Sequence, residues 1–98
     1  MKTLRVFYPD TTATFHEVGA KLDAPMSGKL KAGSKETFKL TAPGAEAVSV
    51  IVEGEWLPLT KNGDLWEGQA TVKGNQVQVA ARFPGSQSFY ILLTYGVG

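Results

Sequence analysis

The sequence contains no cysteine and only one histidine, His16. The absence of cysteine excludes disulfides, thiol catalysis and thiolate metal sites. A single histidine leaves little material for acid–base chemistry, and no Gly-x-Ser-x-Gly motif points to a nucleophilic serine. The acidic residues are scattered, whereas a metal site built from Asp and Glu alone needs a denser cluster. We therefore expect a non-catalytic protein that holds no metal and no other cofactor.

Strong net charge and long apolar runs are also missing. The formal net charge is +1, whereas a dedicated nucleic-acid binder normally has a strongly basic face. No segment approaches the roughly 20 apolar residues of a membrane span. Residues 1–6 begin like a signal peptide, but Tyr8-Pro9-Asp10 follows before an apolar core of about 7–15 residues can form. We expect no nucleic-acid partner, no membrane span and no secretion signal.

Four lysines lie close together in the first half of the chain: Lys29, Lys31, Lys35 and Lys39. One interpretation is a solvated edge of a sheet, because lysines on an edge strand discourage pairing with another sheet. The alternative is a site for an anion. We favour the solvated edge.

Alternation between apolar or small residues and polar residues dominates residues 46–97. The alternating sets are Val48/Val50/Val52, Trp66/Gly68/Ala70/Val72, Val77/Val79/Ala81/Phe83 and Phe89/Ile91/Leu93/Tyr95/Val97. Successive side chains on a strand point to opposite faces of the sheet, so this pattern predicts strands with one dry and one wet face. Tyr90 and Leu92 fall on the outer side of the last strand. An outer face of this kind suggests packing against another domain or subunit.

Turn signals separate these segments. Pro43-Gly44, Asn62-Gly63, Gly74-Asn75 and Pro84-Gly85 are typical turn sequences. The spacing predicts an all-β fold, an immunoglobulin-like antiparallel β-sandwich of about seven or eight strands. The predicted core faces one common interior and consists of Phe38, Leu40, Val48, Val50, Trp66, Val77, Val79, Ala81, Ile91 and Leu93.

The first third of the chain is less regular. Residues 3–8 and residues 15–18 read as two strands, residues 19–32 read as a long connection, and no segment has the period of a helix. The length fits a single domain, residues 1–98. The sequence leaves open whether residues 1–29 belong to the sandwich or form a loosely attached arm.

The two tryptophans differ in their setting. Trp66 lies in the inward register of its strand and is expected in the core. Trp56 follows a turn, precedes Pro58 and lies on a segment that proline restricts to a sheet edge. Two interpretations stay open for Trp56: a lid over the end of the core, or an exposed ring on which a sugar stacks.

Two runs of residues resemble immunoglobulin-like modules of the early-set type: Phe38-x-Leu40-x-Ala42-Pro43-Gly44-Ala45-x-x-Val48-x-Val50 and Trp56-x-Pro58-Leu59-Thr60-Lys61-x-Gly63-x-x-Trp66-x-Gly68. Over residues 30–97 the chain is similar to the non-catalytic domain of bacterial transglutaminase-like, or kyphoscoliosis-peptidase-like, surface proteins. The resemblance implies a spacer, docking or binding module at the bacterial cell surface or outside the cell. Its partners would be other domains of the same polypeptide or a surface protein.

The same runs also resemble glycogen-binding modules, in which a tryptophan stacks on the glucan and a basic residue assists. That resemblance nominates Trp56 and Lys61 as ligand-binding residues and a polysaccharide as the ligand. The chain has Ser86-Gln87-Ser88 where that family carries a second stacking tryptophan. Carbohydrate binding centred on Trp56 is therefore the alternative function.

Overall fold

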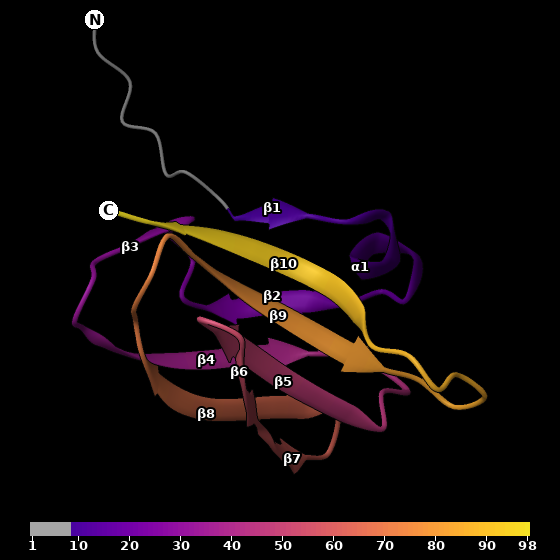
Figure 1. Cartoon of the computed structure of the whole chain (residues 1–98). Coiled ribbons are helices and arrows are strands. Elements are labelled where there is room, and N and C mark those ends of the chain that lie inside the picture. Colours follow the sequence, from indigo (N-terminus) through magenta and orange to yellow (C-terminus); the bar gives the residue numbers. More distant parts are fainter. Residues whose placement is uncertain (1–8) are drawn as a thin grey trace, which may run out of the picture.

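The computed structural model describes residues 9–98, and these residues form two β-sheets packed face to face (Figure 1). The strand expected at residues 3–8 lies outside the described residues. Sheet A has the order β1 (Asp10–Thr11), β10 (Tyr90–Val97), β9 (Gln76–Arg82), β5 (Ala47–Val52) and β6 (Glu55–Pro58), with β3 (Lys29–Leu30) also paired to β10. Sheet B has the order β2 (Lys21–Ala24), β4 (Lys35–Thr41), β8 (Leu65–Thr71) and β7 (Thr60–Asn62).

The predicted all-β sandwich is confirmed. Its ladders are antiparallel, apart from the short parallel pairing of β3 with β10. Residues 9–98 contain ten strands rather than seven or eight, because several are only two to four residues long. Nine of the ten predicted core residues are buried: Phe38, Leu40, Val48, Val50, Trp66, Val77, Val79, Ala81 and Leu93.

The tenth predicted core residue, Ile91, is only partly buried, because β10 contains a bulge. The pairing with β9 shifts between Ile91 and Leu93, so one residue of β10 is extra. At a bulge, two residues of one strand oppose one residue of the other, and the alternation of faces reverses. Leu92 and Leu93 are therefore both fully buried, and the expected outward position of Leu92 is wrong. Ile91 instead pairs with Ala80 on the outer side.

The strand expected at residues 15–18 is also wrong, since helix α1 (Ala13–Glu17) occupies this segment. Thr12 caps the helix: its hydroxyl oxygen accepts a hydrogen bond from the Phe15 N–H at 3.4 Å. The Thr12 hydroxyl donates to the carbonyl of Ile91 at 2.6 Å, which ties the helix to β10. Phe15 then points into the core.

The long connection expected at residues 19–32 contains two strands, β2 and β3. Leu22 of β2 and Leu30 of β3 are buried in the core, whereas their lysine neighbours are exposed. The described part of residues 1–29 is thus built into the sandwich and does not form a separate arm. The hydroxyl of Tyr95 donates to the carbonyl of Pro25 at 2.9 Å and holds the segment between β2 and β3.

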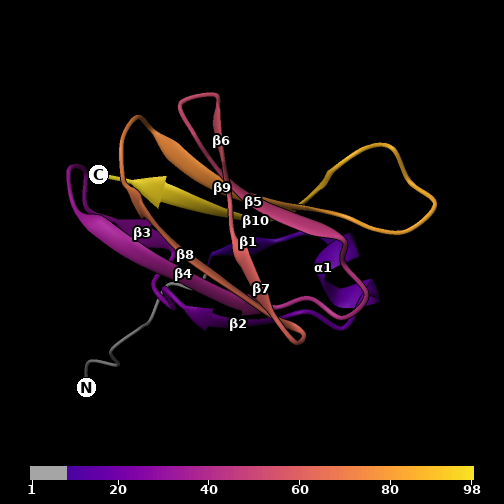
Figure 2. The same cartoon turned by 90° about the horizontal axis from the view of Figure 1, so that it is seen from below.

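One edge of the sandwich is made by a strand that changes sheets. β6 pairs with β5 in sheet A, and β7 pairs with β8 in sheet B, with only Leu59 between them. Figure 2 shows β6 and β7 as one continuous path from one sheet to the other. Leu59 is buried, and its N–H donates to the carbonyl of Val48 at 2.8 Å.

Candidate functional site

The outer face of sheet A carries a row of side chains that crosses five strands. The pairing register aligns Trp56 with Ile51, Ile51 with Gln78, Gln78 with Thr94, and Thr94 with Asp10. Directly paired residues of antiparallel strands share a face, and this face is the outer one, because the neighbouring Val50 and Val79 point into the core. We call these five residues the cross-strand row. Asp10, at its end, is its only charged member.

Trp56 is the most prominent residue of this face, with 47% of its surface exposed. Its ring meets the ring of Phe89 edge-on, with 5.1 Å between the centroids. β5 and β9 lie between the two segments that carry these rings, so the ring pair spans the outer face of the sheet. Ser49 and Ala80, two small residues whose register places them on the same face, are buried.

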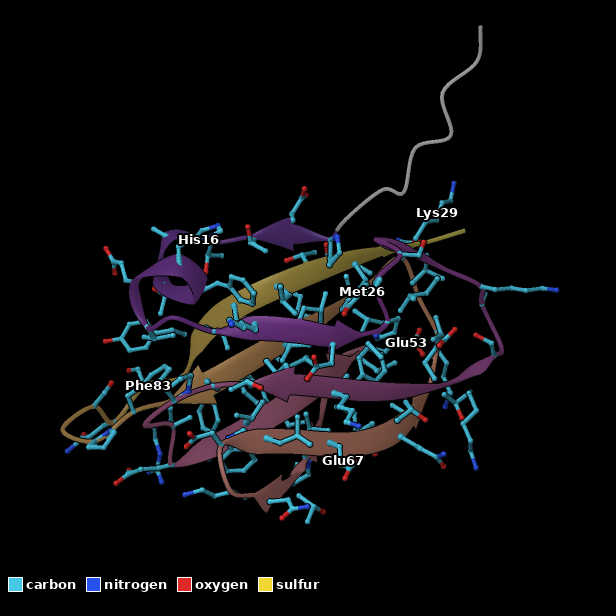
Figure 3. All side chains as sticks on the ribbon, turned by 180° about the vertical axis from the view of Figure 1, so that it is seen from behind. His16, Met26, Lys29, Glu53, Glu67 and Phe83 are labelled. Carbon is cyan, nitrogen blue, oxygen red and sulfur yellow. The ribbon has the colours of Figure 1, made fainter. Side chains whose placement is uncertain are left out.

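The outer face of sheet B is different in character. Its cross-strand pairs are Lys35 with Thr71, Thr37 with Gln69, and Lys39 with Glu67. Figure 3 looks onto this sheet and shows Glu67 on β8. Charged and polar side chains of this kind are typical of a solvated face. The two outer faces of the sandwich are thus unequal: among residues 9–98, the exposed Trp56 and the partly exposed Phe89 lie on that of sheet A.

The structure separates the two ligand-binding residues that the sequence nominated. Trp56 is on β6 in sheet A and contacts Phe89, whereas Lys61 is on β7 in sheet B. The Lys61 Nζ lies 6.0 Å from the centre of the Trp66 ring, within reach of a cation–π interaction. The change of sheet at Leu59 turns Lys61 toward the end of the core. Lys61 therefore covers Trp66, and the neighbours of Trp56 are Phe89 and Ile51.

The four clustered lysines lie in different settings. Lys39 of β4 lies in the interior of sheet B, between β2 and β8, whereas Lys35 at the start of β4 is paired with β8 alone. Among residues 9–98, β3 with Lys29 pairs only with the end of β10, and Lys31 follows it. The predicted lysine edge therefore holds for Lys29 and Lys35 and is wrong for Lys39, which is partly exposed on the outer face of sheet B.

Two shallow clefts adjoin the cross-strand row at one end of sheet A. The first, of about 520 Å³, lies between the turns Glu53–Gly54 and Gly74–Asn75 and is floored by Ile51, Gln76 and Gln78. The second, of about 570 Å³, lies on the other side of Gln76 and reaches Thr94 and Asp10. The two clefts share Asn75 and Gln76. They form a pair of polar hollows beside the row.

Glu53 stands at the entrance of the first cleft in an unusual backbone conformation. Glu53 and Gly54 have φ values of 49° and 78° and form the two-residue turn between β5 and β6. Such a turn requires positive φ at both positions and favours Asn-Gly over Glu-Gly. The Glu53 side chain folds back over Gly74, and a β-carbon added to Gly74 would come within 2.9 Å of the Glu53 Cγ.

The first cleft lies at the end of the molecule that carries Glu53. Phe83, which follows β9, lies toward the opposite end (Figure 3).

The single histidine lies away from these features, on α1 (Figure 3). Its Nε2 is 2.8 Å from the Thr11 hydroxyl oxygen, and its ring packs edge-on against Phe15 with 5.3 Å between centroids. Among residues 9–98, no three His, Asp or Glu side chains gather as a metal site would require. Within the same residues, no helix has the length and apolar character needed to cross a bilayer.

Sequence reasoning found Trp56 but missed Phe89, Ile51 and Gln78 as its companions. The alternation placed Phe89 among the inward residues. The bulge in β10 shifts the register between Ile91 and Leu93, and it cannot be recognised in a run of consecutive apolar residues. Gln78 was visible only as one polar residue in an alternating strand. A scan of protein-family models finds no match to this chain, and a search of curated proteins finds none either.

Proposed function

We propose that this chain is a non-catalytic spacer or docking module that contacts its partner through the outer face of sheet A. The observation that carries the proposal is the inequality of the two outer faces. Aromatic rings and few charges are typical of surfaces that pack against another protein or domain. Trp56 and Phe89 supply such rings on sheet A, whereas sheet B presents Lys39 and Glu67.

The non-catalytic character and the location are supported by the sequence. The chain has one histidine and no cysteine, and His16 lies on α1, away from both clefts. The resemblance to modules of bacterial surface proteins supports an exported or cell-surface protein. The partner in this proposal is another domain of the same polypeptide or a neighbouring surface protein.

The accessibility of Trp56 tests the docking proposal. Trp66 is 5% exposed and Trp56 is 47% exposed, so iodide should quench mainly the fluorescence of Trp56 in the isolated domain. We expect this quenching to fall when the domain is joined to its partner domain in a longer polypeptide or is bound to a partner surface protein, because the docked partner shields the ring. The variant Trp56→Phe reports the contribution of Trp66 alone and serves as the control. Equal quenching of Trp56 in all contexts would refute docking through this face.

Carbohydrate binding centred on Trp56 is the second candidate function. The observation that favours it is an exposed indole that Phe89 already holds in place. A ring that is ordered before binding loses little conformational entropy when a ligand stacks on it. Lys61 has no part in this version of the site, because it faces Trp66. Titration of glucans against the wild type and Trp56→Ala tests this function, and equal behaviour of both proteins would reject it.

A further inference from the structure

We propose that sheet B binds an acidic segment of a partner protein, which adds to β4 as an extended, antiparallel strand. The site is the part of β4 that lies beyond the end of β2, residues 35–38, and we call it the open edge. This proposal goes beyond docking through the outer face of sheet A. It concerns the other sheet, and it gives a role to the clustered lysines that the proposed function leaves unused.

The open edge exists because β2 is shorter than β4. β4 pairs with β8 along all seven of its residues, whereas β2 pairs only with residues 39–41. After β2 the chain crosses to β3 on sheet A (Figure 1). The hydroxyl of Tyr95 holds the carbonyl of Pro25 on this crossing at 2.9 Å. Among residues 9–98, no strand pairs with residues 35–38 on the side of β2.

The backbone groups of Lys35 and Thr37 point to this unpaired side. The Val72 N–H donates to the Ser34 carbonyl at 2.8 Å, so Ser34 directs its carbonyl toward β8. Hydrogen-bonded and non-hydrogen-bonded residues alternate along an antiparallel strand, so the even-numbered residues of β4 bond to β8 and the odd-numbered residues bond away from it. Within the described part of the chain, no ladder or loop bond reaches the outward N–H and C=O groups of Lys35 and Thr37. Such groups are a template for a further strand.

Lysines surround the open edge. Lys35 and Lys39 lie on the outer side of β4, and Lys31 is exposed in the turn that precedes this strand. None of these lysines forms an ion pair with another residue of the range 9–98. The nearby acidic residues are Asp23 on β2 and Glu36 on the inner side of β4. The excess of positive charge attracts a segment that carries carboxylates.

Charge decides between the possible occupants. A second copy of the chain would bring its own Lys35 and Lys39 against the first pair, and like charges on neighbouring strands are destabilising. The chain's own residues 1–8 contain Lys2 and Arg5 and no acidic residue. An acidic segment of a partner meets neither repulsion. It prefers β4 to the outer side of β2, because β2 carries a bulge that disturbs further pairing.

The two faces of β4 determine the side-chain pattern of the bound segment. Directly paired residues of antiparallel strands share a face. The residues opposite Lys35 and Thr37 therefore point outward, among the lysines, and are acidic. Their neighbours point inward, beside the buried Phe38, and are apolar. The bound segment thus alternates acidic and apolar residues, and the backbone N–H groups of its acidic residues donate to β4.

Amide hydrogen exchange of the complete chain, followed by NMR, tests the proposal with the end-blocked peptide Glu-Val-Glu-Val-Glu. In the free protein, the amides of Lys35 and Thr37 should exchange quickly, whereas β8 protects those of Glu36 and Phe38. Saturating peptide should slow exchange at Lys35 and Thr37 at least about tenfold. Slow exchange of these two amides in the free protein would overturn the proposal, because the edge would already be occupied. Unchanged exchange with saturating peptide would overturn it as well.

Three further peptides test the chemistry and the direction of the added strand. Lys-Val-Lys-Val-Lys should not bind. Methylation of the glutamate nitrogens should abolish binding, because it removes the donors to β4, whereas methylation of the valine nitrogens should be tolerated. The affinity for the acidic peptide should fall as salt is raised. Equal binding of the acidic and basic peptides would overturn the role of the lysines. Loss of binding on valine methylation alone would overturn the antiparallel addition.

Two matched variants place the peptide on the open edge. Lys35→Glu replaces an attraction by a repulsion and should weaken binding roughly tenfold. Lys21→Glu makes the same charge change at the far end of β2, opposite Thr41, and should alter the affinity less than about twofold. Urea unfolding shows whether each variant is folded. Equal losses in the two variants would mean that the peptide responds only to net charge, and a larger loss in Lys21→Glu would place it on β2; either result would overturn the proposal.

Discussion

The side chain of Leu59 fills the space above Gly68. A β-carbon added to Gly68 would lie 2.8 Å from the Leu59 Cδ2, closer than such atoms approach in proteins. Gly68 is on β8 in sheet B, while the Leu59 N–H is bonded to Val48 in sheet A. A glycine of one sheet thus makes room for the residue that connects it to the other sheet.

This contact predicts unequal effects for two strand glycines. Gly68→Ala forces Leu59 to move within a packed core and should lower the free energy of unfolding by about 1–3 kcal/mol. The control is Gly96→Ala on β10, where the added carbon would meet its nearest atom at 3.8 Å. Neither glycine has a positive φ. Urea denaturation measures both, and equal losses would contradict the role of Leu59.

The bulge in β10 makes a second prediction. Leu93→Ala removes a fully buried side chain and should cost about 2–5 kcal/mol of stability. Ile91→Ala changes a partly exposed residue of the outer face and should cost only about 1 kcal/mol. Urea unfolding measures the free energy of unfolding of both variants, and an unchanged m-value shows that the two can be compared. A larger loss of stability in Ile91→Ala than in Leu93→Ala would mean that Ile91 faces the core, as the alternation in the sequence predicts.

The turn at Glu53 predicts a substitution that stabilises the protein. Asparagine adopts positive φ more readily than glutamate, so Glu53→Asn should raise the free energy of unfolding by about 0.5–1 kcal/mol. Glu55→Asn, at a neighbouring exposed position without positive φ, should give no such gain. Thermal unfolding followed by circular dichroism reports both. A stability loss in Glu53→Asn would mean that the contact of the Glu53 side chain with Gly74 contributes more to stability than the relief of backbone strain at position 53.

The indole of Trp66 makes a fourth prediction. Its Nε1 is buried without a hydrogen-bond partner among the described residues, and an unpaired buried donor costs about 1–3 kcal/mol. Trp66→Phe loses some packing but also removes this donor, so the two effects should nearly cancel. Trp66→Ala should cost about 3–5 kcal/mol, because it leaves a cavity. If urea unfolding finds Trp66→Phe as damaging as Trp66→Ala, the indole N–H has a partner in solution.

Much of the fold could be predicted because, in residues 35–83, the positions of apolar residues in the sequence match the positions that are buried in the structure. In β8 and β9 the apolar set of the alternation matches the buried inner face, at Trp66 and Ala70 and at Val77, Val79 and Ala81. Pro43-Gly44 and Pro84-Gly85 mark true turns, closed by the hydrogen bonds from the Ala45 N–H to Ala42 and from the Ser86 N–H to Phe83. Local chemistry decides these elements, so one sequence is enough.

Other elements depend on distant contacts and could not be predicted. α1 is only five residues long, too short for a helical period, and its cap residue Thr12 is held by β10. The bulge in β10 lies among consecutive apolar residues, where either register looks equally good. The hairpin turn expected at Asn62-Gly63 forms one residue later, at Gly63-Asp64, because Asn62 still pairs with Leu65. Gly63 has a φ of 70°, a conformation that glycine adopts without strain.

The candidate site was predictable only in part. Proline at position 58 predicted an edge strand for Trp56, and β6 is at the edge of sheet A. Of the two interpretations left open for Trp56, its 47% exposure favours the exposed ring over the lid. Its contact with Phe89 joins segments that are distant in sequence and separated by two strands, so no local pattern reports it. The direction of Lys61 depends on the change of sheet at Leu59. A sequence that reads as one interrupted edge strand does not show where each half is paired.

The passage of β6 into β7 also bears on self-assembly. Chains polymerise most easily when a sheet ends in a long, straight strand that a second molecule can extend. On this side, sheet A ends after the four residues of β6 and sheet B after the three residues of β7. An incoming strand would have to follow the bend at Leu59, and Pro58 has no N–H to offer it. The same feature that joins the sheets thus discourages fibril growth from this edge of the sandwich.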